Sequence, residues 1–149
     1  LNVIVHATRV FHGKEVHDAY AYRFDIKTTR KSVVFSGDTA EPNRNLIALA
    51  KDADVLVHEV QMNSLIPVFV QGVAPRQRAA VREHFLTSHT DVAEVPRVAK
   101  EANAKRLAFC HYGLQKDAAA FLPPSRKAAA RVGYRGEILA PVELDEVAI

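Results

Sequence analysis

The sequence predicts an α/β domain in which strands and helices alternate, and three observations support this class. Short, mainly apolar runs recur along the 149 residues, as in VVF, DVLV and RLAF, and such runs are typical of buried strands. Between them lie segments whose apolar residues follow a helical spacing. With 48% hydrophobic and 25% charged residues, the chain has the composition of one soluble globular domain.

The chain begins with two predicted strands that face each other. Residues 3–12 and 19–27 alternate or run apolar with β-branched and aromatic side chains, and the polar stretch GKEVHD separates them. This arrangement predicts an antiparallel pair. Residues 32–36 form a third predicted strand after the turn TTRK.

A helix and another strand follow. Residues 42–51 carry apolar side chains on a helical spacing, and Pro42 suits a first helical turn. Residues 54–60 (DVLVHEV) form a continuous apolar run typical of a buried strand. Strand, helix and strand in this order predict a parallel crossover.

The second half of the chain has weaker patterns. Residues 61–73 contain Pro67 and Gly72 and are expected to form a loop or an insertion. Residues 75–86 predict a helix, and Thr90 or Asp91 can cap the next helix. That helix either kinks at Pro96 or has its regular part begin there. A strand over residues 105–110, a helix over 124–132 and a closing strand over residues 137–142 and beyond complete the α/β layers.

The overall charge gives little information about partners. The formal net charge is +3, from 20 basic and 17 acidic residues, and the basic residues are scattered, with no Lys/Arg run. The single Cys110 excludes an internal disulfide. We expect no membrane-spanning segment, because no apolar stretch approaches the roughly 20 residues that a bilayer requires. The compartment stays open: the cytoplasm is slightly favoured, and periplasmic or secreted locations remain compatible.

Several ligand-type side chains stand where predicted strands end. Asp38 follows VVFSG, His58 and Glu59 close DVLVHE, and His111 follows RLAFC; His89 precedes a helix start in LTSHTD. Because the carboxyl ends of parallel strands lie on one edge of a sheet, these residues are expected to converge. Carboxylate and imidazole are ligands that suit zinc, manganese or iron. Each residue taken singly is more often a cap or a structural residue.

These stretches resemble a known family. SGDTAEPNRNLIALAKDADVLVHEV and REHFLTSHTDVAEVPRVAKEANAKRLAFCHYG are similar to the carboxyl-terminal half of metallo-β-lactamase-fold hydrolases, in the ribonuclease Z and arylsulfatase-like branch. The resemblance covers nearly the whole chain. It implies half of an αββα sandwich, a mixed sheet with helices on one face, in a single domain over residues 1–149 that is truncated at its amino terminus.

The resemblance also implies roles for individual residues. Asp38 falls at the position of a metal-bridging aspartate, and His111 at that of the last histidine ligand of the second metal. His89 matches a histidine that contacts the scissile phosphate and donates a proton, and Glu59 matches the glutamate that orients it.

Two further histidines complete the candidate site. His12 is similar to a histidine near the active site and is expected to contact substrate. His58, beside Glu59, is a second substrate-binding candidate, with a purely structural role as its alternative.

The implied activity is hydrolysis of phosphodiester or related ester bonds by water activated at two zinc ions, with manganese or iron as alternatives. One departure limits it: the family motif HxHxDH, which supplies most ligands of the first metal, is absent from these 149 residues. The segment alone is therefore expected to be inactive without the missing half, or to associate as a homo-oligomer that covers its sheet.

Several functions stay open at this point. If the chain is part of an enzyme, tRNA 3′-end processing, phosphodiesterase, arylsulfatase and lactonase activities are the alternatives. The alternative to an enzyme is a non-catalytic half-domain that serves as an interaction or structural module. Because residues 61–73 are short and apolar and no flexible tRNA-binding arm is recognisable, we expect a small-molecule ester substrate in preference to tRNA.

Overall fold

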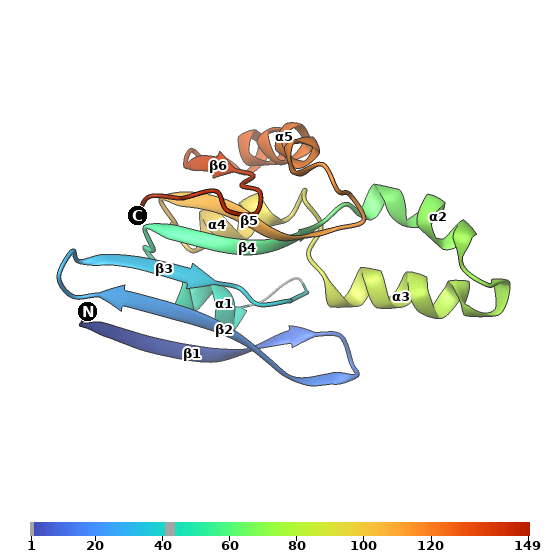
Figure 1. The fold of residues 1–149 in the computed structure, drawn as a ribbon, viewed down its shortest axis with the longest axis horizontal. Helices are drawn as coiled ribbons and strands as arrows, with labels where there is room; N and C mark the ends of the chain where they lie inside the picture. The colour runs from blue at the N-terminus through green and yellow to red at the C-terminus, as the bar shows by residue number, and fades with distance from the viewer. Residues whose placement is uncertain (1, 41–43) are drawn as a thin grey trace.

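Residues 2–40 and 44–149 are described by the structure, a computed structural model of the chain. They form one six-stranded sheet whose strands lie side by side in chain order (Figure 1). The strands are β1 (Val3–His12), β2 (Val16–Ile26), β3 (Lys31–Phe35), β4 (Val55–Gln61), β5 (Arg106–Gly113) and β6 (Glu137–Leu139). The α-helices are α1 (Arg44–Leu49), α2 (Ile66–Phe69), α3 (Arg78–Ser88), α4 (Val95–Glu101) and α5 (Leu122–Val132).

The sheet is mixed. β1, β2 and β3 pair antiparallel, which confirms the predicted strand pair. β3, β4, β5 and β6 pair parallel, which confirms the predicted crossover. The parallel strands therefore all end at one edge of the sheet, where their loops can share a site.

The helices that pack on the sheet cover one face. In Figure 1, α1 and α4 lie behind the sheet, and no helix lies in front of it. Between the layers lies a core that includes Val34, Leu56 and Leu107 of the strands with Leu46 and Val98 of the helices. Each such side chain, once buried, stabilises the fold by roughly 1.5–3 kcal/mol. The predicted α/β class with helices on one face is confirmed.

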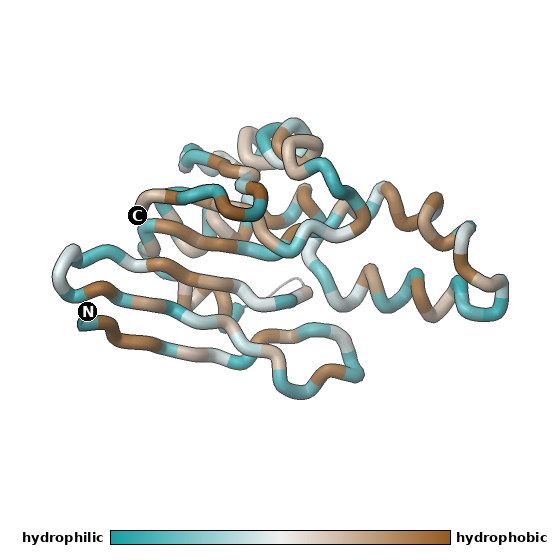
Figure 2. The backbone as a smooth tube through the Cα atoms, in the orientation of Figure 1, coloured by the Kyte–Doolittle hydropathy of each residue, from teal (hydrophilic) through white to brown (hydrophobic). Residues whose placement is uncertain are grey.

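The opposite face of the sheet is apolar and only partly covered. Val33, Val55 and Ala108 form a small cluster there, and Figure 2 shows hydrophobic residues along much of the middle strands. The segment after β6 lies over one side of this face and leaves a hollow of about 660 Å³. Parallel strands are normally covered on both faces, so this face has the character of the inner surface of a sandwich.

Some predicted elements differ in detail. Residues 61–73, expected as a loop or an insertion, continue β4 at Gln61 and then fold into short helical turns that include α2. The closing strand is only Glu137–Leu139, because Pro141 lacks the N–H that a continuing ladder needs. Pro96 lies in the first turn of α4, so the helix begins there without a kink. The predicted start of α1 at Pro42 lies outside the described residues.

α2 and α3 together form a helical hairpin, residues 66–88, that projects away from the rest of the domain (Figure 1). Arg78 stabilises its turn by donating hydrogen bonds to the carbonyl oxygens of Val73 and Gln71 at 2.9 and 3.0 Å. Among the described helices, none combines the length and the apolar character needed to cross a membrane.

Candidate active site

Asp38 is positioned by a tight turn at the end of β3. Gly37, just before it, has a φ of +61°, and a Cβ at Gly37 would lie 2.4 Å from the carbonyl oxygen of Tyr20. Only glycine fits this turn without strain. The turn leaves the Asp38 side chain 41% exposed, so the carboxylate faces outward from the edge of the sheet.

His111 reaches the same point from β5 through a bulge. Glu59 pairs with Cys110 and Val60 pairs with Tyr112, so His111 is the extra residue of its strand. Its φ is +44°, a left-handed conformation that costs a non-glycine residue energy. The bulge brings His111 Nε2 to 3.5 Å from Asp38 Oδ2. Backbone strain at this position is thus associated with the pairing of two ligand-type side chains.

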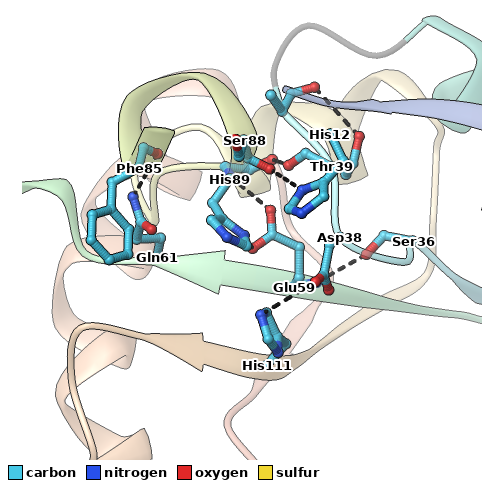
Figure 3. Close-up of polar contacts among 12 residues, drawn as sticks. His12, Ser36, Asp38, Thr39, Glu59, Gln61, Phe85, Ser88, His89 and His111 are labelled. Atoms are coloured by element: carbon cyan, nitrogen blue, oxygen red, sulfur yellow. Dashed lines mark hydrogen bonds and ion pairs between the residues drawn. The ribbon is translucent and has the colours of Figure 1, made fainter. Parts of the chain in front are cut away.

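Glu59 is the buried acid of the site. Its side chain is 1% exposed, and its Oε1 accepts a hydrogen bond of 2.6 Å from the backbone N–H of Thr90. Its Oε2 lies 3.2 Å from His89 Nδ1 (Figure 3). The backbone N–H of Glu59 also donates to Ser36 Oγ at 2.9 Å, which joins the ends of β3 and β4.

His89 is held by Glu59 at the end of α3. Burial lowers the pKa of His89, but the hydrogen bond and charge of Glu59, together with the charge of Asp38, outweigh burial and raise the pKa above its ordinary value of 6.5. The rings of His89 and His111 lie 5.5 Å apart. Since Nδ1 faces Glu59, Nε2 is the nitrogen with which His89 can serve a substrate.

His12 and His84 extend the site. His12 Nδ1 donates to the carbonyl oxygen of Ser88 at 2.7 Å, and its ring lies 4.9 Å from that of His89. The ring of His84 lies 6.4 Å from that of His12 and 6.2 Å from that of His89. His84 is not among the residues predicted from the sequence. Its spacing of four residues from Ser88 places both on one helical face, and their side chains lie in hydrogen-bond contact at 3.3 Å.

His58 does not reach the site surface. It is fully buried, and its Nδ1 donates to the carbonyl oxygen of Glu59 at 2.6 Å. Burial lowers its pKa, against the opposing effects of the charge and the backbone hydrogen bond of Glu59. His58 therefore has no surface with which to contact a substrate, and the structure favours the structural alternative for this residue.

The structure thus brings Asp38, His111, His89, Glu59 and His12 to one edge of the sheet. Their chemical roles stay predictions. Asp38 and His111 fit a metal ion in kind, because a carboxylate and an imidazole face each other across 3.5 Å. They do not fit it in number: within residues 2–40 and 44–149, no three Asp, Glu, His or Cys side chains are grouped so that they could hold a metal ion, whereas zinc sites usually use three or four protein ligands.

One family model and several known proteins are similar to this chain in sequence. Residues 1–112 match the family model described as the beta-lactamase superfamily domain. The chain is 34% identical to ribonuclease Z of Myxococcus xanthus over 108 residues, covering 72% of this chain and 29% of that protein. It is 32% identical over 119 residues to ribonuclease Z of Halorubrum lacusprofundi, covering 80% and 33%. A zinc phosphodiesterase ELAC protein 2 homolog of Caenorhabditis elegans is 31% identical over 121 residues, covering 81% and 12%.

Solved structures show the same fold. The metallo-beta-lactamase fold protein YhfI of Bacillus subtilis aligns with a TM-score of 0.60 at 20% identity, covering 92% of this chain and 46% of that one. The short form of human tRNase Z aligns with a TM-score of 0.52 at 21% identity, covering 74% and 37%. The chain spans about a third or less of the length of the curated relatives that it matches.

The comparisons correct one prediction. We expected a small-molecule ester substrate in preference to tRNA, but the relatives are named as ribonuclease Z, and a structural neighbour is a tRNase Z. These names point to RNA, so the preference for a small ester is wrong. It relied on the short, apolar character of residues 61–73, and the structure shows that this segment contains α2, the first arm of the projecting α2–α3 hairpin.

Proposed function

The chain belongs to the beta-lactamase superfamily domain family, and on that premise we propose that it carries part of the active site of a metal-dependent hydrolase that cleaves a phosphodiester bond in RNA, at the 3′ end of precursor tRNA. The observation that carries the proposal is the pairing of His89 with the buried carboxylate of Glu59, beside Asp38 and His111. The pair supplies a proton donor at the place where two ligand-type side chains meet.

His89 acts as the proton donor. Glu59 raises its pKa, so a larger share of His89 is protonated near neutral pH than for an ordinary histidine. Because Nδ1 is engaged with Glu59, Nε2 is the ring nitrogen that remains to serve a substrate. Protonation of the departing ribose oxygen by such a group is worth about 10²- to 10⁴-fold in rate.

The oxygens of Glu59 are both occupied, and this fixes the pair. One accepts from the N–H of Thr90 and the other faces His89. Thr90 is in turn fixed by its hydroxyl, which donates to the carbonyl oxygen of Thr39 at 2.8 Å. The residue that follows Asp38 is therefore linked to the residue that follows His89, and the two halves of the site keep a fixed separation.

Asp38 and His111 are the residues that would hold the metal. A zinc ion bound there would act as a Lewis acid on the phosphate and lower the pKa of water. Two ligands are too few for tight binding, so the proposal requires further ligands from polypeptide beyond the described residues.

The proposal is tested with protein expressed from its complete gene. It is incubated with a precursor tRNA that carries a 3′ trailer and with Zn²⁺, and the products are sized. We expect cleavage at the trailer junction that a chelator abolishes and that Asp38→Ala reduces at least about 10²-fold. The control is Asp18→Ala, which removes a carboxylate that is 73% exposed on β2 and should leave cleavage unchanged.

Two results would overturn the proposal. Cleavage that persists in Asp38→Ala would place the chemistry elsewhere. Absence of cleavage, combined with absence of metal in elemental analysis of the purified protein, would favour the non-catalytic interaction module, which the apolar sheet face could serve.

A further inference from the structure

A cleft of about 680 Å³ lies between the β1–β2 turn and the α2–α3 hairpin. Its apolar wall is formed by hairpin side chains that include Phe69, Val81 and Phe85. Its opposite wall includes His12, whose ring is 4.9 Å from that of His89. The His12 ring therefore lies between the cleft and His89, the proton donor proposed above.

The part of the cleft beside His12 and Ser88 is fixed to the candidate active site. Gly13 has a φ of +71°, and a Cβ there would lie 2.5 Å from Ser88 Oγ. This close approach, together with the hydrogen bond from His12 to the carbonyl oxygen of Ser88, holds the β1–β2 turn against the end of α3. Because His89 directly follows Ser88 in the chain, a group bound in the cleft would have a defined position relative to His89.

Phe69 is the most exposed ring of the apolar wall. The residue is 47% exposed, and its ring meets that of Phe85 edge to face, at 5.1 Å and 84°. Phe85 is itself anchored, because Gln61 Nε2 donates to its carbonyl oxygen at 3.0 Å. An exposed aromatic ring that is supported from one side is a surface on which a flat ligand can stack.

The rim of the cleft carries charges of both signs. Lys14 lies 3.9 Å from Glu83, with side chains 83% and 67% exposed, and Glu15 and His84 line the same cleft. An ion pair this exposed and this long contributes little, so the Lys14 ammonium is available to a phosphate. The cleft thus offers an aromatic surface, imidazole edges and one cation, beside the two rim carboxylates of Glu15 and Glu83.

We propose that this cleft receives an unpaired nucleobase that flanks the scissile phosphate of the RNA, with the base stacked on Phe69. The inference rests on the proposed function, since it takes the substrate to be RNA. Proteins recognise single-stranded RNA by stacking unpaired bases on aromatic side chains and by contacting base edges and phosphates. The cleft adjoins the site of cleavage, so the base that it holds belongs to a nucleotide next to that bond.

The first test compares variants of the stacking ring. Binding of precursor tRNA to protein from the complete gene is measured by fluorescence anisotropy, with a chelator present to prevent cleavage. Phe69→Leu keeps an apolar side chain but removes the ring, and should weaken binding about five- to hundredfold. Phe69→Tyr keeps the ring and should bind as the parent does. The matched control is Val68→Ala, at a neighbouring residue that is 67% exposed and does not line the cleft.

The second test removes the base instead of the ring. Precursor tRNAs with one abasic nucleotide on either side of the scissile phosphate are bound to the parent protein and to Phe69→Leu. We expect one abasic position to weaken binding to the parent to the level of Phe69→Leu, and the two changes together to cost no more than either alone.

The outcomes separate the two proposals. If the parent protein cleaves precursor tRNA but neither Phe69→Leu nor either abasic substitution weakens binding, the base site is refuted and the proposed function stands. If the parent neither binds nor cleaves precursor tRNA, the proposed function fails and the base site fails with it. Equal losses in Phe69→Leu and Phe69→Tyr would also refute stacking, because the second variant retains the ring.

Discussion

Glu59 Oε2 lies 3.2 Å from His89 Nδ1, and the glutamate in this pair is 1% exposed. The two residues are 30 positions apart in the chain and come from the end of β4 and the end of α3. A buried carboxylate that is satisfied on one oxygen by a backbone N–H and on the other by an imidazole fixes both the orientation and the charge of that imidazole.

Glu59→Gln should lower the pKa of His89. Glutamine keeps an oxygen that can accept from the N–H of Thr90 but loses the negative charge that raises the pKa of His89. The titration of His89, followed by NMR in metal-free protein, should move to lower pH. Because His89 must be protonated to act as an acid, the alkaline fall in cleavage rate should move in the same direction. Asp18→Asn, which removes a surface carboxylate, serves as the control, and a His89 titration unaltered in Glu59→Gln would contradict the assignment.

Gly37→Ala should damage the site through the backbone. The new Cβ would meet the carbonyl oxygen of Tyr20 at 2.4 Å, and the φ of +61° disfavours any residue with a side chain. We expect a loss of about 1–3 kcal/mol in the free energy of unfolding, measured by urea denaturation, together with loss of cleavage because Asp38 is displaced. Gly72→Ala is the matched control, since a Cβ there meets no atom within 4 Å. Equal stability of the two variants would show that the turn before Asp38 is not constrained.

Asp54→Asn should destabilise the fold in a pH-dependent way. Burial raises the pKa of Asp54, but hydrogen bonds from Lys105, the N–H of Ser32 and Lys31 outweigh burial and lower the pKa from 3.8 to about 2. A carboxylate whose pKa is lower in the folded state stabilises the fold at pH values above the pKa that it has in the unfolded chain. This contribution is lost as the pH falls from 3.8 towards about 2. With both lysines partly exposed, we expect a cost of about 1–2 kcal/mol near neutral pH.

The measurement for Asp54 is urea denaturation of parent and Asp54→Asn at neutral pH and at about pH 2. The difference in the free energy of unfolding should shrink as the pH falls. A difference that is the same at both pH values would mean that the charge of Asp54 is not responsible.

The parallel strands and their polar ends were predictable from local patterns. VVF and DVLV contain apolar, β-branched runs of the kind typical of strands, and residues at the ends of parallel strands share an edge. For this reason Asp38, Glu59 and His111 could be selected from the sequence before their distances were known. The resemblance to a family added the possible roles of these residues.

Other features depended on tertiary structure. The bulge at His111 arises from its pairing with β4 and has no local signal. Residues 61–73 carry Pro67 and Gly72, which weaken the helical pattern, and α2 has only four residues. His84 joins the site because its ring lies near that of His12, which comes from β1. His58 and Glu59 are neighbours, and both side chains are of types that can bind a metal ion or a substrate. Only the fold shows that Glu59 pairs with His89 whereas His58 is buried.

We propose that His89 protonates the oxygen that leaves, and a comparison of two substrates tests this role most directly. A ribose oxygen needs a proton to depart, whereas the p-nitrophenolate of bis(p-nitrophenyl) phosphate is stable enough to leave without one. With protein from the complete gene, His89→Ala should lower the rate of precursor tRNA cleavage about 10²- to 10⁴-fold and affect bis(p-nitrophenyl) phosphate far less. His17→Ala, at an exposed histidine of β2, should change neither rate. Equal losses on both substrates in His89→Ala would contradict the claim.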